Sequence, residues 1–161
     1  MSTSRASGDN NTNNVRQDDA NPTGAYVMTA GVVVFLIATF LSWITNQDDE
    51  SFGGYEADSL IAFTAYLGVG FAIALIMAAQ RSERRIQHRG LSLASMAAGV
   101  AALGLALSYL IDVPGAAERG SSMEWSTEIG VYVALVGALL WVVGSFLLAR
   151  EPEGHVVRDH R

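Results

Sequence analysis

The chain has 161 residues, of which 50% are hydrophobic and only 16% charged, with 16 glycines, no cysteine and a formal net charge of −6. Soluble domains usually carry about 25% charged residues, so the composition excludes an ordinary globular domain with a water-facing surface. The lack of thiols also excludes a disulfide scaffold, a cysteine-ligated zinc site and an iron–sulfur cluster.

Residues 1–23 are polar, rich in asparagine and without apolar periodicity, which predicts a disordered cytoplasmic tail. Four blocks without acidic or basic side chains follow, at residues 26–45, 60–80, 91–111 and 129–149. As a helix rising 1.5 Å per residue, each block can span the roughly 30 Å hydrocarbon core of a bilayer. None alternates polar and apolar residues as a barrel strand does. The sequence therefore predicts an all-α fold: an integral membrane four-helix bundle of two hairpins over residues 24–150, with a cytoplasmic tail at 151–161.

Aromatic and polar residues mark the ends of these blocks. Tyr26 and Trp43 bracket the first block, Tyr109 ends the third, and Trp125 precedes the fourth. Amphipathic rings favour the boundary between membrane and water, so we expect these four rings at that boundary. Asp58 stands where its carboxylate can cap the second helix.

Basic residues fall almost entirely on one side of the predicted bundle. Nine of the ten arginines lie in the two tails and the middle segment, whereas the loops 46–59 and 112–128 hold only Arg119 together with nine acidic residues. By the positive-inside rule, this asymmetry predicts a protein of the cell membrane with both termini in the cytoplasm. The apolar run of the first block exceeds that of a signal peptide, so we expect it to remain as an anchor.

The middle segment holds Arg81, Arg84, Arg85 and Arg89. If the second helix continues past residue 80, Arg81, Arg85 and Arg89 share one face at the level of the lipid headgroups. Each such charge near an anionic leaflet contributes about 1 kcal/mol. Two interpretations stay open: recognition of lipid headgroups, or an effect on topology alone.

No residue pattern indicates catalysis or cofactor binding. The four blocks contain no ionisable acid or base, and His88, His155 and His160 all fall in predicted cytoplasmic segments. No Ser/His/Asp set and no haem site can therefore be assembled in the membrane. The acidic loop 46–59 lacks the alternating spacing of a calcium-binding loop. We expect no enzymatic activity, no catalytic or metal-binding residues, no cofactor and no nucleic-acid partner.

Small residues recur at regular spacing in three of the blocks. They are Gly70, Ala74 and Ala78 in the second block, Ala94, Ala98, Ala102 and Ala106 in the third, and Gly130, Gly137 and Gly144 in the fourth. Small side chains allow membrane helices to approach closely, so these ladders predict helix-packing faces. A seven-residue repeat keeps one stripe aligned in a left-handed crossing near 20°. The opposite flank of the last block is expected to face lipid or a groove, and it comprises Leu135, Leu139, Trp141, Val142 and Phe146.

The two halves of the chain can be overlaid with Ser42 and Trp43 on Ser108 and Tyr109. Each half is then a block, an acidic outer loop, a second block and a basic inner segment. A parallel internal duplication and the ordinary likeness of membrane hairpins both account for this pattern.

Three stretches suggest a family: Phe40 to Ile44 at the end of the first block, Ser51 to Tyr55 in the outer loop, and Ile129 to Leu140 in the last block. Together with the pattern of blocks over residues 24–150, they resemble the small, uncharacterised four-span (tetraspan) membrane proteins of actinobacterial type. The resemblance implies the same four-span organisation and transfers no activity or site residue.

Two functions compete. The composition and the ladders favour a non-catalytic multi-pass protein, an accessory or scaffold subunit that acts through helix–helix contacts, with lipids and either a membrane protein or a second copy as partners. The alternative is a small oligomeric transporter, pore or holin-like protein, which requires polar side chains along an oligomer interface. The candidates for such a lining are scattered: Thr29, Thr39, Thr64, Ser95, Ser108 and Ser145.

Overall fold

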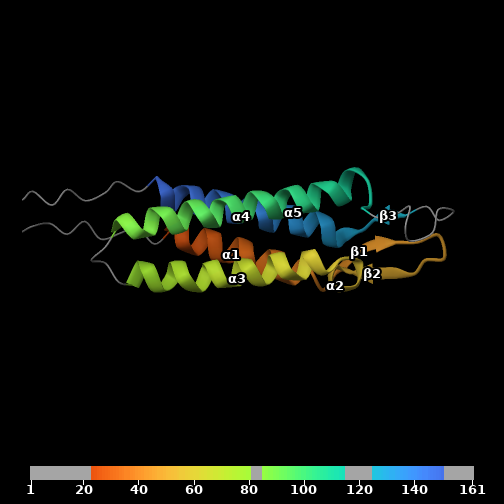
Figure 1. Ribbon diagram of the computed structural model, residues 1–161. Helices are drawn as coiled ribbons and strands as arrows, with labels where there is room; N and C mark the ends of the chain where they lie inside the picture. The colour runs from red at the N-terminus through yellow and green to blue at the C-terminus, as the bar shows by residue number, and fades with distance from the viewer. Residues whose placement is uncertain (1–22, 81–84, 115–124, 151–161) are drawn as a thin grey trace, which may run out of the picture.

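The computed structural model describes residues 23–80, 85–114 and 125–150. Four helices lie side by side along one long axis: α1 (Thr23–Ala38), α3 (Ser59–Gln80), α4 (Arg85–Ile111) and α5 (Ile129–Ala149) (Figure 1). Helix α1 packs against α5 and α3, and α4 packs against the same two helices. The architecture within the described residues is therefore mostly helical, and consecutive long helices run in opposite directions (Figure 1).

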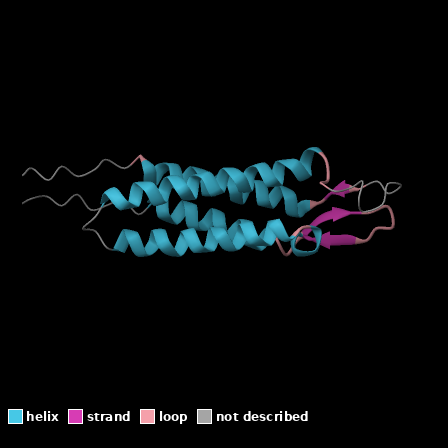
Figure 2. Ribbon diagram, viewed as in Figure 1, coloured by secondary structure: helices cyan, strands magenta, loops and turns pink. Residues whose placement is uncertain are grey.

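A small antiparallel sheet lies at one end of the helices (Figure 2). Its strands are β1 (Ser42–Thr45), β2 (Ser51–Gly53) and β3 (Ser126–Thr127), in the order β2-β1-β3, and the short helix α2 (Gly54–Ala57) joins β2 to α3. The all-α prediction is thus incomplete, because two loops that are distant in sequence pair with each other through β1 and β3.

The first helix ends at Ala38, seven residues before the end of the predicted block. The Thr39 hydroxyl donates to the Leu36 carbonyl oxygen at 2.6 Å, and the Ala38 carbonyl oxygen accepts from the Leu41 amide at 3.1 Å and from the Trp43 indole at 2.7 Å. With the last carbonyls bonded in this way, the chain can leave the helix and extend as β1. The aromatic and β-branched residues of β1 suit a strand.

Three helices in the described part of the chain are long and apolar enough to cross a membrane, at Ser59–Ala78, Arg89–Ile111 and Ile129–Ala149. Helix α1 is apolar but shorter than these three. This corrects the prediction of four equivalent long blocks. The apolar content of the first block continues into β1, so hydropathy alone overestimated the length of its helix.

Buried residues recur along the helices in steps of alternately four and three. Examples are Ile61, Ala65, Gly68, Ala72 and Leu75 on α3, Ser95, Gly99, Ala102, Ala106 and Tyr109 on α4, and Gly130, Ala134, Gly137, Trp141 and Gly144 on α5. This seven-residue periodicity is typical of helices that cross at about 20° in a left-handed bundle.

Four fully buried rings form the centre of the core below the sheet. Phe35 lies 6.4 Å from both Trp43 and Trp141, and Trp43 lies 5.3 Å from Tyr109, all edge to face. Trp43 and Tyr109 are therefore core residues, fully buried and packed against each other. Trp125 is half-buried and packs on Phe52 at 5.7 Å.

The overlay of the two halves matches residues that differ in local structure. Ser42 and Trp43 belong to a strand, whereas Ser108 and Tyr109 belong to the last turns of α4. The overlaid rings of Trp43 and Tyr109 contact each other in the core. The secondary structure at these overlaid positions therefore does not support an internal duplication.

Candidate helix-packing site

Helices α1 and α5 approach each other backbone to backbone at Gly137. A Cβ atom at this position would lie 2.5 Å from the amide nitrogen of Phe35 and 2.9 Å from the carbonyl oxygen of Gly31. Real Cβ atoms do not come this close to backbone atoms, so any larger residue requires the two helices to move apart. The close approach of α1 and α5 therefore requires glycine at position 137.

Gly130 and Gly144 make the same approach, one heptad to either side. A Cβ at Gly130 would lie 2.5 Å from the carbonyl oxygen of Ser42, and a Cβ at Gly144 would overlap the backbone of Met28. The glycine stripe of α5 is therefore buried against α1 and the beginning of β1. We call this contact the glycine seam.

The seam also contains two glycines of α1 that lie outside the predicted ladders. A Cβ at Gly31 would overlap the amide nitrogen of Trp141 and lie 2.7 Å from the Gly137 carbonyl oxygen. A Cβ at Gly24 would lie 2.9 Å from Cγ of Leu148. The seven-residue separation of Gly24 and Gly31 matches that of the stripe on α5, and this spacing is the signal that could have identified them.

The alanine ladder of α4 does not form one packing face. Ala94 is exposed, Ala98 is half-buried, and Ala102 and Ala106 are fully buried. Four residues advance a helix by about 400°, so each step of a four-residue ladder rotates about 40° around the axis. The ladder therefore turns from the outside of the bundle into its core.

The same rotation affects the ladder of α3. Gly70 is exposed, and a Cβ there would meet nothing within 4 Å, while Ala74 and Ala78 are half-buried. The packing glycine of this helix is instead Gly68, where a Cβ would lie 2.8 Å from Cη2 of Trp141. Gly70 thus has no packing role among the described residues.

Two of the scattered polar residues meet in the core. The hydroxyl oxygens of Ser95 on α4 and Ser145 on α5 lie 3.0 Å apart, and the indole of Trp141 donates to the Ser95 oxygen at 3.0 Å. All three residues are fully buried. Trp141 therefore departs from the expected outward flank of α5, whose other members are exposed or half-buried. We call this hydrogen-bonded group the serine anchor.

A second polar network ties the sheet to the helices. The amide of Glu128 donates to the Trp43 carbonyl oxygen at 2.9 Å, and the Thr45 hydroxyl donates to Oε1 of Glu128 at 3.0 Å. The Thr127 hydroxyl donates to the carbonyl oxygen of Tyr109 at 2.7 Å. Strand β1 is thereby bonded to the residue that precedes α5, and strand β3 is bonded to the last turns of α4.

The loop between β1 and β2 is organised by Asn46. Its Oδ1 accepts from the amides of Asp48 and Glu50 at 3.0 and 2.9 Å, and its Nδ2 donates to the Glu50 carboxylate at 3.1 Å. Asp49 adopts a left-handed φ of 61° within this turn. The chain reverses here through side-chain bonds to the backbone, which leaves the carboxylates of Asp48 and Asp49 exposed.

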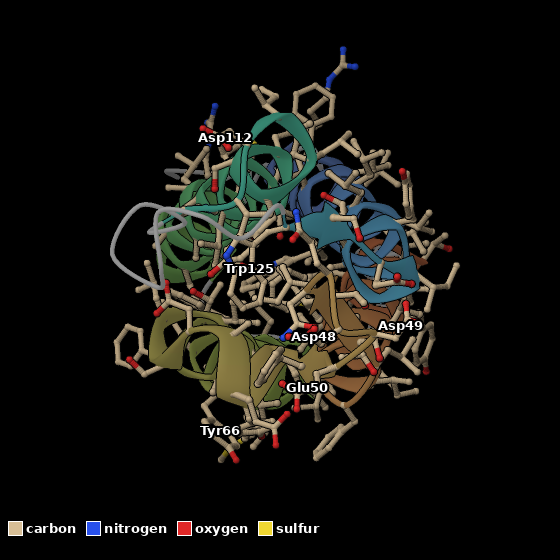
Figure 3. All side chains as sticks on the ribbon, turned by 90° about the vertical axis from the view of Figure 1, so that its right-hand side faces the viewer. Asp48, Asp49, Glu50, Tyr66, Asp112 and Trp125 are labelled. Atoms are coloured by element: carbon tan, nitrogen blue, oxygen red, sulfur yellow. The ribbon has the colours of Figure 1, made fainter. Side chains whose placement is uncertain are left out.

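Acidic side chains gather at the sheet end of the bundle, where Figure 3 labels Asp48, Asp49, Glu50 and Asp112. Among the described residues, no three His, Asp or Glu side chains lie close enough to hold a metal ion. Asp58 caps α3 through its Oδ1, which accepts from the Leu60 amide at 2.8 Å.

The arginines of the described residues lie at the opposite end of the helices. Within the described residues α3 extends to Gln80, and Arg85 and Arg89 belong to the first turns of α4, so these two arginines do not lie on the second helix. Arg81 and Arg84 lie outside the described residues, as do the tails at 1–22 and 151–161. Arg150 at the end of α5 lies over the ring of Phe146, 5.2 Å from its centroid.

No protein-family model matches this chain. Neither a curated protein nor a solved structure matches it. The glycine seam, the serine anchor and the sheet end are therefore the features from which a role can be inferred.

Proposed function

We propose that this chain is a non-catalytic, multi-pass protein of the cell membrane, related to the tetraspan proteins that its sequence resembles. It is a four-helix bundle with both termini in the cytoplasm. It acts as an accessory or scaffold subunit through helix–helix contacts. The observation that supports this role best is the outward apolar surface of all four long helices.

Large apolar side chains point away from the bundle over most of its length. They include Ile37 on α1, Phe63 and Ile73 on α3, Val100 on α4, and Val136 and Val143 on α5, each about half exposed or more. Exposing apolar surface to water costs about 25 cal/mol per Å². A surface of this extent marks contact with lipid or with other membrane proteins.

Helix α1 alone is too short to cross the hydrocarbon core of a bilayer. Its 16 residues span about 24 Å, a few ångströms less than the hydrocarbon core. The turn at residues 39–41 and strand β1 extend this length. The amides of the turn donate to carbonyl oxygens of α1, and β1 pairs with β2 and β3. Internal hydrogen bonding is the condition for non-helical backbone at membrane depth, so it supports a fourth crossing.

The interior of the bundle favours a packing role over a pore. Met28, Phe35 and Trp141 fill the space between the helices and are fully buried. The two serines that could have lined a passage bond to each other and to Trp141 in the serine anchor. The outward faces of the described helices are mostly apolar, which is unsuited to a polar passage between copies.

The proposal is tested by purifying the full chain from membranes in mild detergent and identifying what remains bound by mass spectrometry. A stoichiometric membrane-protein partner that survives stringent washing is the expected result. Release of a small dye from liposomes that contain the purified chain alone would instead indicate a pore. Recovery of the chain in the soluble fraction without detergent would contradict the membrane assignment itself.

A further inference from the structure

Three aromatic side chains from three different elements form one exposed cluster near the sheet end of the bundle. Phe40 follows α1, Tyr55 belongs to α2, and Tyr66 lies in the second turn of α3. The ring centroids are 5.1 Å apart for Phe40 and Tyr55 and 6.3 Å apart for Tyr55 and Tyr66. The rings are 70%, 37% and 59% exposed, respectively. We call this cluster the aromatic shelf.

The two tyrosines of the shelf are joined at their polar tips. Their hydroxyl oxygens lie 2.7 Å apart, so one hydroxyl donates to the other. This bond uses one of the two hydroxyl hydrogens, and the second hydrogen remains available for an acceptor outside the chain. Tyr66 lies at the rim of the bundle (Figure 3). The shelf therefore presents a polar donor on an otherwise apolar outer surface.

The shelf starts at Tyr55, beside the polar end of the molecule, and extends to Tyr66 on the apolar outer face of α3. Glu56, next to Tyr55, is exposed, and Asp58 caps the start of α3. Tyr66 comes eight residues after Asp58, about 12 Å along the axis. Leu60 and Phe63, between Asp58 and Tyr66, are exposed and apolar, as are Ile73 and Met77 further along α3. Tyrosine favours this kind of boundary, since its ring is apolar and its hydroxyl polar.

We propose that the aromatic shelf binds a glycerophospholipid of the outer leaflet. The rings of Phe40, Tyr55 and Tyr66 contact the glycerol and the upper acyl chains, and a tyrosine hydroxyl donates to an ester or phosphate oxygen of the lipid. This inference rests on the proposed membrane location. It goes beyond the scaffold role, because it assigns a ligand and a place for it.

The aromatic shelf differs in residue size from the surfaces through which the helices of this chain pack. Where two helices pack most closely here, the contact is made by glycines such as Gly31 and Gly137. The shelf is made instead of bulky rings that stand out from the bundle, and such rings hold a second helix at a distance. Flexible lipid chains can fill the irregular surface between them.

The test uses the full chain reconstituted in phosphatidylcholine and phosphatidylglycerol vesicles, with tryptophan as a depth probe. The native Trp43 and Trp141 are fully buried, so lipid-borne quenchers reach them poorly, and the half-buried Trp125 is exchanged for phenylalanine in every variant to remove its signal. Tyr66→Trp places a reporter on the shelf, and Ile73→Trp places a matched reporter deeper on the exposed face of the same helix. The quencher is bromine, attached to the acyl chains either near the ester group or near the chain ends.

Tyr66→Trp should be quenched most by bromine near the ester group, and Ile73→Trp most by bromine near the chain ends. Quenching of Ile73→Trp without quenching of Tyr66→Trp would mean that protein covers the shelf, and the inference would be overturned. If neither reporter is quenched, the chain does not lie in lipid, and the proposed function fails as well.

A second measurement isolates the hydroxyl groups. The double variant Tyr55→Phe, Tyr66→Phe keeps the rings and removes both hydroxyls, and it should retain about threefold less phospholipid in native mass spectrometry. Tyr132→Phe, which changes an exposed tyrosine of α5 outside the shelf, should retain as much lipid as the wild type. Equal lipid retention by the double variant and Tyr132→Phe would overturn the assignment of a hydroxyl to the lipid.

Discussion

The hydroxyl groups of Ser95 and Ser145 lie 3.0 Å apart between α4 and α5, and no part of either residue is exposed. The Ser95 oxygen also accepts from the Trp141 indole, so three polar atoms satisfy one another inside an apolar bundle. Hydrogen bonds of this kind between membrane helices contribute about 0.6–2 kcal/mol. They hold a defined register, because a slide of either helix separates all three atoms.

Ser95→Ala should destabilise the bundle by about 1–3 kcal/mol, since it leaves the Trp141 indole and the Ser145 hydroxyl without the Ser95 oxygen. The measurement is the thermal midpoint in detergent, followed by the intrinsic fluorescence of the three tryptophans. Ser108→Ala is the matched control, because the Ser108 hydroxyl donates to Leu105 of its own helix. Equal effects of the two substitutions would show that the serine anchor does not hold the helices together.

Gly137→Ala should lower stability by about 1–3 kcal/mol, the usual cost of overpacking, because its Cβ meets the backbone of Phe35. Gly70→Ala is the control, since a Cβ there meets nothing within 4 Å. Alanine favours the helix over glycine by up to about 1 kcal/mol, so Gly70→Ala should be neutral or stabilising. The measurement is the thermal midpoint of each variant. Equal midpoints for Gly137→Ala and Gly70→Ala would show that Gly137 does not pack against the backbone of α1.

Trp43→Phe should destabilise the sheet end by about 1–3 kcal/mol, because it removes the hydrogen bond to the Ala38 carbonyl oxygen and leaves a cavity. Limited proteolysis of the loop between β1 and β2 should become faster at the same time. Tyr132→Phe, on the exposed surface of α5, serves as the control. Unchanged proteolysis of Trp43→Phe would mean that the indole does not secure β1.

The topology can be read with single cysteines, because the chain has none of its own. Asp48→Cys, in the exposed acidic loop, should react with a membrane-impermeant maleimide in intact cells. Arg89→Cys, at the other end of the bundle, should react only after the membrane is permeabilised. The reverse labelling pattern would place the termini outside the cell.

The role of the arginines is tested by exchanging Arg81, Arg84, Arg85 and Arg89 together for glutamine. Only five of the nine predicted inner arginines then remain, so the orientation signal weakens and a mixture of orientations is expected. Asp48→Cys in this background should be labelled only in part in intact cells. Complete labelling, as in the parent, would show that the tails alone set the orientation.

Several features of this protein follow from the sequence by itself. The ends of α3 and α5 lie within one residue of the predicted blocks, because a long apolar run bounded by polar residues has few other ways to satisfy its backbone. The alignment of Gly130, Gly137 and Gly144 on one stripe likewise follows from their spacing. These are local properties, determined by a residue and its near neighbours along the chain.

The tertiary structure decided the features that depend on distant segments. Ile44 pairs with Thr127 across the sheet, and Trp43, the preceding residue of β1, is fully buried in the core. Ser95 and Ser145 each look like a stray polar residue in its own block, and only the register of α4 against α5 brings them together. The direction of the Trp141 side chain followed from the same packing. A sequence pattern records which face of one helix is apolar or small, but the partner of that face is set by the free energy of the whole bundle.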